Sequence, residues 1–185
     1  MNKRHQYFLR GIIGLVLGFF VLMNAEASVN DQLLAEEILR LVNQYRVQHG
    51  LGKLTMDPIL THEASEHSRN MATHRISFGH DGFKKRMDYL HTHVPASLAG
   101  AENVAFNYKT AQIVVDGWVH SAGHRRNIMG HYNLTGIGIA RDAHGKPYFT
   151  QMFLQSDPKL ASARITVPQA KSSKRGRKAF KGFVG

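Results

Sequence analysis

The sequence predicts an α+β fold, with helices in the first part of the chain and an antiparallel hairpin at its end. Apolar residues recur at three- and four-residue steps through residues 31–49, which is the spacing of one helix face. Residues 135–140 alternate isoleucine with glycine or alanine, and an aromatic-rich stretch follows after a turn. Helices that precede a run of strands are typical of α+β proteins with an antiparallel sheet.

The two ends of the 185-residue chain have the composition of processing or tail segments rather than of a fold. Residues 1–27 have the features of a cleaved signal peptide: a basic start, an apolar run over 11–23 and small residues at Ala25 and Ala27. The apolar run is shorter than the ~20 residues of a membrane-spanning helix. We therefore predict an exported protein, periplasmic or extracellular, with a single domain over residues 28–158.

The chain contains no cysteine, which excludes disulfides, thiol chemistry and cysteine-ligated metal sites. Its formal charge of +11 is concentrated at the ends: the signal region contributes +2 and residues 171–185 contribute +6, which leaves +3 for residues 28–170. Residues 159–185 are predicted to form a basic, disordered tail. Such a tail could contact anionic surfaces through charge alone or act only as a solubilising extension, and no specific nucleic-acid recognition is expected.

The helical part of the chain carries clear start and stop signals. Gly50 is placed to end the first helix. Asp57 followed by Pro58 predicts the start of a second helix, which runs to about His74. The apolar spacing of this second helix predicts its buried side: Leu60, Ala64 and Met71.

Downstream, residues 84–91 fit a short helix, and residues 92–109, with a proline and a glycine, are expected to be an irregular connection. Thr110 can cap a third helix, which Gly123 is expected to interrupt. The hairpin follows, with strands over 135–141 and 148–154. The first of these strands has one row of very small side chains, which suits close packing against another element.

Two of the twelve histidines, His62 and His67, lie beside glutamates on the second predicted helix. A zinc-protease helix needs its two histidines four residues apart, whereas these are five apart and about 140° around the helix. His62 is placed to pair with Glu66, and His67 with Glu63, so we interpret this stretch as surface pairing.

Three other polar residues, His80, Glu102 and His124, lie in or beside turns and are flanked by residues typical of a core. A carboxylate between two imidazoles could help to bind a divalent ion. It could alternatively raise the pKa of a histidine that carries protons. Spacing alone does not show that the three residues meet.

Several motifs taken together resemble the CAP family, which includes cysteine-rich secretory proteins, plant pathogenesis-related proteins of class one and insect venom allergens. They are His80, Ala-Glu-Asn at 101–103, Trp118, Ser-Ala-Gly-His-Arg-Arg-Asn-Ile at 121–128 and the Gly-Ile-Gly-Ile strand. Residues 42–51 and 148–153 are similar to the first helix and last strand of the bacterial branch. The resemblance covers residues 33–154 and implies a three-layer α-β-α sandwich with a large central cleft.

The resemblance implies that His80, Glu102 and His124 line this cleft. We predict that a divalent ion such as zinc binds weakly at these three residues. Eukaryotic members have a glutamate where this chain has Ser121, and a hydroxyl is the poorer ligand. Asp116 or His120, on the same helix, could compensate.

Other positions acquire expected roles from the same resemblance. Ser121, Asn127 and Gln151 are expected to line the cleft. Asn103 is expected to hold its loop by backbone hydrogen bonds, and Trp118 to lie in the core.

The leading hypothesis is a monomeric binding module for a small molecule, a lipid or a protein. No Gly-x-Ser-x-Gly elbow or cysteine nucleophile is present. An extracellular hydrolase, either a protease or an esterase, is the alternative, with His80, Glu102 and His124 as its catalytic candidates. A surface-adhesion protein acting through the basic tail is the third possibility.

Overall fold

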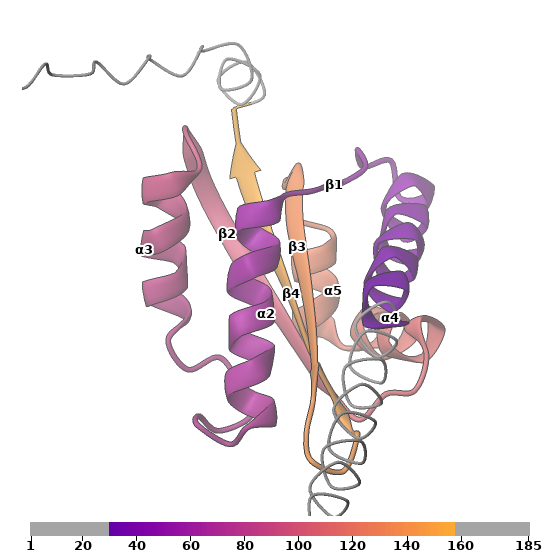
Figure 1. Cartoon of the computed structure of the whole chain (residues 1–185). Helices are drawn as coiled ribbons and strands as arrows, with labels where there is room; N and C mark the ends of the chain where they lie inside the picture. The colour runs from indigo at the N-terminus through magenta and orange to yellow at the C-terminus, as the bar shows by residue number, and fades with distance from the viewer. Residues whose placement is uncertain (1–29, 158–185) are drawn as a thin grey trace, which may run out of the picture.

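The computed structural model describes residues 30–157, which form three layers (Figure 1). The predicted signal peptide, 1–27, and the predicted tail, 159–185, lie outside the described residues. In chain order the elements are a helix over residues 30–48, β1 (Thr55–Met56), α2 (Pro58–Ala72), α3 (Phe83–His93), β2 (Ser97–Phe106), α4 (Ala111–His120), α5 (Ala122–Ile128), β3 (Leu134–Arg141) and β4 (Pro147–Ser156).

The strands form one four-stranded sheet in the order β1-β3-β4-β2. β4 pairs antiparallel with both β3 and β2, as expected for the hairpin and its neighbour. β1 pairs with β3 in parallel over only two residues, so the complete sheet is mixed rather than purely antiparallel. The α+β class and the three-layer sandwich are confirmed.

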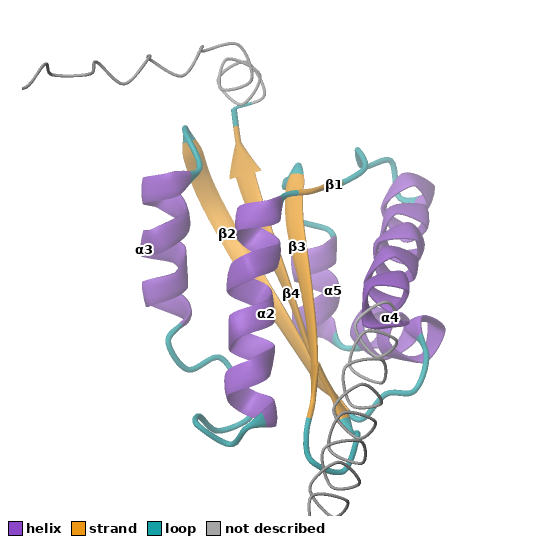
Figure 2. Cartoon of the chain, viewed as in Figure 1, coloured by secondary structure: helices purple, strands orange, loops and turns teal. Residues whose placement is uncertain are grey.

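Helices cover both faces of this sheet (Figure 2). On one face α2 and α3 pack on Met152 and Leu154 of β4. On the other face, helix 30–48, α4 and α5 pack on Phe149 and Phe153 of the same strand. Because successive side chains of a strand point to opposite faces, one strand supplies the centre of both cores.

α2 begins as predicted, because the Asp57 carboxylate accepts the backbone N–H groups of Ile59 and Leu60. The three residues predicted on its inner side are buried. The predicted small-residue row of β3 is also confirmed, because Gly136 and Gly138 face the backbone of α2 closely.

Two predictions about the middle of the chain are wrong. Residues 97–106 form the long strand β2 instead of an irregular connection, and the strand pairs with β4 along most of its length. The helix break lies at Ser121, which has extended backbone angles, and not at Gly123. Gly123 is inside α5, so His124 projects from a helix rather than from a loop.

None of the helices formed by residues 30–157 combines the length and apolar character needed to cross a membrane.

Candidate functional site

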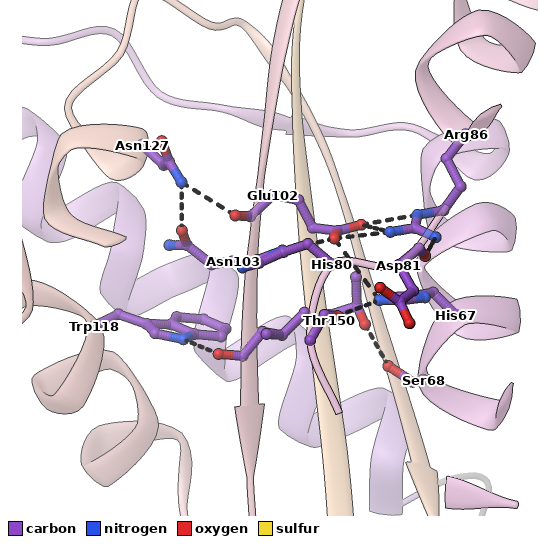
Figure 3. Close-up of polar contacts among 12 residues, drawn as sticks. His67, Ser68, His80, Asp81, Arg86, Glu102, Asn103, Trp118, Asn127 and Thr150 are labelled. Carbon is purple, nitrogen blue, oxygen red and sulfur yellow. Dashed lines mark hydrogen bonds and ion pairs between the residues drawn. The ribbon is translucent and has the colours of Figure 1, made fainter. Parts of the chain in front are cut away.

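Glu102 of β2 lies at the centre of a buried polar cluster on the face of the sheet that carries α2 and α3 (Figure 3). Its side chain is only 1% exposed. Arg86 of α3 binds both carboxylate oxygens: Nε lies 2.9 Å from Oε2, and Nη2 lies 2.8 Å from Oε1. The remaining nitrogen, Nη1, donates to the carbonyl oxygen of Asp81 at 2.8 Å. This two-point contact compensates the buried negative charge.

His80 shares the same carboxylate, with its Nδ1 2.9 Å from Oε1 of Glu102. A carboxylate held by Arg86 accepts hydrogen bonds, so we assign the proton to Nδ1 of His80. The Nε2 atom of His80 is then the ring nitrogen with a free lone pair. About half of the His80 side chain is exposed, which makes that lone pair accessible to a ligand.

His67 is the second imidazole beside Glu102, and the prediction that it pairs at the surface with Glu63 is wrong. Its ring is buried, with Nε2 2.9 Å from the carbonyl oxygen of Gly79 and 3.7 Å from Oε1 of Glu102. Its Nδ1 has no hydrogen-bond partner among the described residues. Glu66 binds Arg69, so the predicted pairing of His62 with Glu66 is replaced by another ion pair.

Burial lowers the pKa of His67, and the nearby Glu102 offsets this only in part. Below a pH of about 6.5, the unfolded chain binds a proton at this position that the folded protein excludes. We therefore expect the free energy of unfolding to fall on acidification from about pH 7.5 to pH 5, by at most about 1.4 kcal/mol per pH unit from this group.

Urea unfolding at several pH values would measure this effect, with His67→Gln as the comparison because an amide can still donate to the Gly79 carbonyl. The variant should lose less stability on acidification than the wild type. Equal pH dependence in the two proteins would contradict a neutral, buried His67.

His124 and His80 line one cavity of about 590 Å³, whose wall includes Trp118 and Ser121. Burial is the main cause that lowers the pKa of His124, and the nearby imidazole of His80 adds to this effect, so the imidazole of His124 is favoured in the neutral form. No hydrogen bond or ion pair joins His124 to Glu102 among the described residues. His124 and His80 thus share one cavity, whereas Glu102 does not line this cavity and contacts His80 and His67.

The same cavity has an aromatic side. Phe78 and Phe106 both line it, with ring centroids 6.2 Å apart, and both remain well exposed. The ring of Phe106 also packs on Tyr148 at 4.5 Å. Two imidazoles therefore lie in a cavity that also offers apolar surface to a ligand.

Asn127, Asn103 and Trp118 connect the outer edge of β2 to α4 and α5. Asn127 Nδ2 donates to the carbonyl oxygen of Glu102 and to Oδ1 of Asn103, and Trp118 Nε1 donates to the carbonyl oxygen of Val104. Asn103 Nδ2 donates to the carbonyl oxygen of His124, a bond to the backbone as expected, but this bond joins β2 to α5 and does not hold a loop. Trp118 is buried, as predicted.

The remaining predicted positions have different surroundings. Asn127 lines a smaller hollow of about 290 Å³ together with His80 and Glu102. Gln151 is fully buried, donates to Oγ1 of Thr135 and does not line the cavity of the two histidines. Neither Asp116 nor His120 lines that cavity, and Nδ1 of His120 forms a hydrogen bond with the backbone carbonyl oxygen of Asp116.

Within residues 30–157 no group of three or more histidines, aspartates, glutamates or cysteines is arranged to hold a metal ion. Both oxygens of Glu102 accept hydrogen bonds from Arg86, and Oε1 also contacts His80.

A family model described as CAP, the cysteine-rich secretory protein family, matches residues 39–153. Two curated proteins of Bacillus subtilis strain 168 are similar to this chain. The uncharacterized membrane protein YlbC is 34% identical over 125 residues, which are 65% of this chain and 34% of YlbC. The uncharacterized protein YkwD is 30% identical over 121 residues, which are 64% of this chain and 46% of YkwD. The chain thus spans between a third and a half of these relatives.

Solved structures share the fold. A cysteine-rich secretory protein from Staphylococcus aureus superposes with a TM-score of 0.58 at 24% identity, over 68% of this chain and 39% of that chain. An extracellular protein with an SCP domain from Bacillus anthracis gives 0.57 at 25% identity, over 68% and 41%. An outer surface protein from Borrelia burgdorferi gives 0.54 at 17% identity, over 64% and 90%.

Proposed function

The chain belongs to the CAP, or cysteine-rich secretory protein, family, and on that premise we propose that it is an exported binding module. Its ligand site is the cavity that His80 and His124 share. The observation that carries the proposal is the hydrogen bond from His80 Nδ1 to Glu102, which leaves Nε2 of His80 available beside the second imidazole. Export is supported by the signal-like N-terminus and by the extracellular or surface descriptions of similar structures.

The two imidazoles fit a divalent ion such as zinc, whereas Glu102 does not fit as its direct ligand. Imidazole nitrogen is a common zinc ligand, and a carboxylate behind a ligating histidine orients the ring. Zinc sites in proteins ordinarily have three or four protein ligands, so two histidines predict weak binding. A bound ion would offer a Lewis-acidic contact to a polar group of a ligand, while Phe78 and Phe106 receive its apolar part.

Isothermal titration calorimetry with zinc chloride tests the metal site. We expect measurable, weak binding by the wild type and no detectable binding by either His80→Ala or His124→Ala. The matched control is His120→Ala, on the exposed face of α4, which should leave the titration unchanged. Zinc binding that is unchanged in the two single variants His80→Ala and His124→Ala, or that is lost in His120→Ala, would contradict the assignment.

The organic part of the site is tested with the anionic fluorophore anilinonaphthalene sulfonate, which binds accessible apolar surface. Ser121→Trp places a large ring in the cavity, and we expect it to weaken fluorophore binding by about tenfold, or ~1.4 kcal/mol. Ala122→Trp is the control, because Ala122 is exposed and does not line the cavity. Equal affinities in the two tryptophan variants would contradict a ligand site here.

A hydrolase is the second candidate, because a carboxylate that orients a histidine is also the arrangement of a general base. The His80→Ala variant separates the two functions. Hydrolysis of p-nitrophenyl butyrate that depends on His80 would favour the enzyme, and an equal background rate in both proteins would favour the binding module.

A further inference from the structure

Among residues 30–157, the outer edge of β3 has no strand partner along most of its length. β1 pairs only with Leu134 and Thr135, after which the chain turns into α2. In Figure 1, β3 continues between α2 and the N-terminal helix beyond the short segment labelled β1. Unpaired strand edges attract another strand, and proteins commonly cover them.

The direction of the free backbone groups follows from the observed pairing. The Thr135 carbonyl accepts the N–H of Asp57, so the peptide groups of Thr135 point away from β4. Because peptide groups alternate along a strand, those of Ile137 and Ile139 point to the same outer side. No hydrogen bond from the described residues reaches these groups from that side. Ile137 is buried and Ile139 is half-buried, so the accessible part of the edge lies around Ile139.

A groove of about 730 Å³ runs along this edge, between helix 30–48 and α2. One wall is apolar, with Ala35, Leu39 and Met56, whereas the wall of α2 presents Thr61 and Ser65. An extended chain in the groove would direct alternate side chains to the two walls. Apolar residues would contact the first wall, and small or hydroxyl-bearing residues would contact the second.

Among the described residues, some charged side chains that line the groove have a partner of opposite charge and one does not. Arg141 is neutralised by Asp31, with Nη2 2.6 Å from Oδ1. Glu36 receives only a neutral hydrogen bond, from Gln32, and has no cation partner among the described residues. A basic side chain on the bound segment would therefore complement Glu36.

We propose that this groove binds an extended segment of a partner protein, which adds to β3 as a strand. The segment has apolar residues at every second position, small or hydroxyl-bearing residues between them, and a lysine or arginine placed to reach Glu36. Backbone pairing supplies affinity in this mode of recognition, and the side-chain pockets supply selectivity. The groove is separate from the histidine cavity, so this proposal does not depend on the proposed function.

A phage-displayed library of random dodecapeptides, screened on the full chain, tests the proposal. We expect enrichment of alternating sequences that carry a basic residue. Binding of the synthesised peptide should fall about tenfold or more in Ser65→Phe, which fills the groove, and in Glu36→Lys, which reverses its charge. His80→Ala should leave peptide binding unchanged.

N-methylation of the selected peptide separates strand addition from simple apolar contact. Methyl groups on the peptide nitrogens that face β3 should abolish binding, whereas methyl groups on the alternate nitrogens should leave it intact. Failure to enrich any peptide, or binding indifferent to Ser65→Phe or to the position of the methyl groups, would overturn the proposal. If N-methylation at either set of nitrogens leaves peptide binding unchanged and lauric acid displaces the peptide, the groove is an acyl-chain site and the proposal is overturned.

Discussion

Replacing Arg86 by methionine is expected to lower the free energy of unfolding by about 3–5 kcal/mol, because it leaves a buried carboxylate without its main cation. Glu102 would keep only the hydrogen bond from His80 and the more distant ring of His67. Neither imidazole replaces the two-point contact of a guanidinium. Urea unfolding at neutral pH, followed by circular dichroism, measures the change.

Two further variants identify the cause of this loss. The double variant Arg86→Met with Glu102→Met should recover much of the stability, because an apolar pair of similar volume removes the uncompensated charge. Arg69→Met is the surface control, since Arg69 pairs with Glu66 in an exposed position and should matter little. A loss from Arg86→Met no greater than that from Arg69→Met would contradict the central role of the buried pair.

The ion pair between Arg86 and Glu102 belongs to the part of the site that sequence reasoning missed. His80, Glu102 and His124 were predicted from a family resemblance, and the structure brings His80 to each of the other two separately. Arg86 and His67 were not recognised because both lie on helices, where charged residues are usually solvent-facing. The signal was nevertheless present: His67 continues the buried spacing of Leu60, Ala64 and Met71.

The fold was more predictable from sequence than the site, for a physical reason. Helix caps and hairpins depend on neighbouring residues, so the start of α2 and the pairing of β3 with β4 follow from local signals. β2 has no apolar alternation to reveal it. Its Glu102 and Asn103 are both buried, and each is satisfied by side chains from elements far along the chain.

Substituting Gly138 by alanine is expected to destabilise the protein by about 3 kcal/mol or more, although it adds only one methyl group. The added Cβ would lie 2.2 Å from the backbone nitrogen of Ser65 and 2.3 Å from the carbonyl carbon of Ala64. These are backbone atoms of α2, so no side-chain rotation can relieve the overlap. The helix itself would have to move away from the sheet.

Gly123→Ala is the matched control, because its added Cβ would meet no atom within 4 Å and Gly123 lies inside α5. Alanine there should stabilise the protein by about 0.5–1 kcal/mol, since it is the better helix former. Thermal unfolding should separate the variants, with the melting temperature of Gly138→Ala about 10 °C lower than that of the wild type. Equal melting temperatures for wild type and Gly138→Ala would refute the close packing of α2.

The consequence of this packing extends to the ligand cavity. α2 carries His67, whose ring forms a hydrogen bond with the carbonyl oxygen of Gly79. This bond fixes the position of the residue that precedes His80. A displaced α2 would loosen that contact before the protein unfolds. Gly138→Ala is therefore expected to weaken zinc binding at His80 and His124 even at temperatures where the variant remains folded, whereas Gly123→Ala should bind zinc as the wild type does.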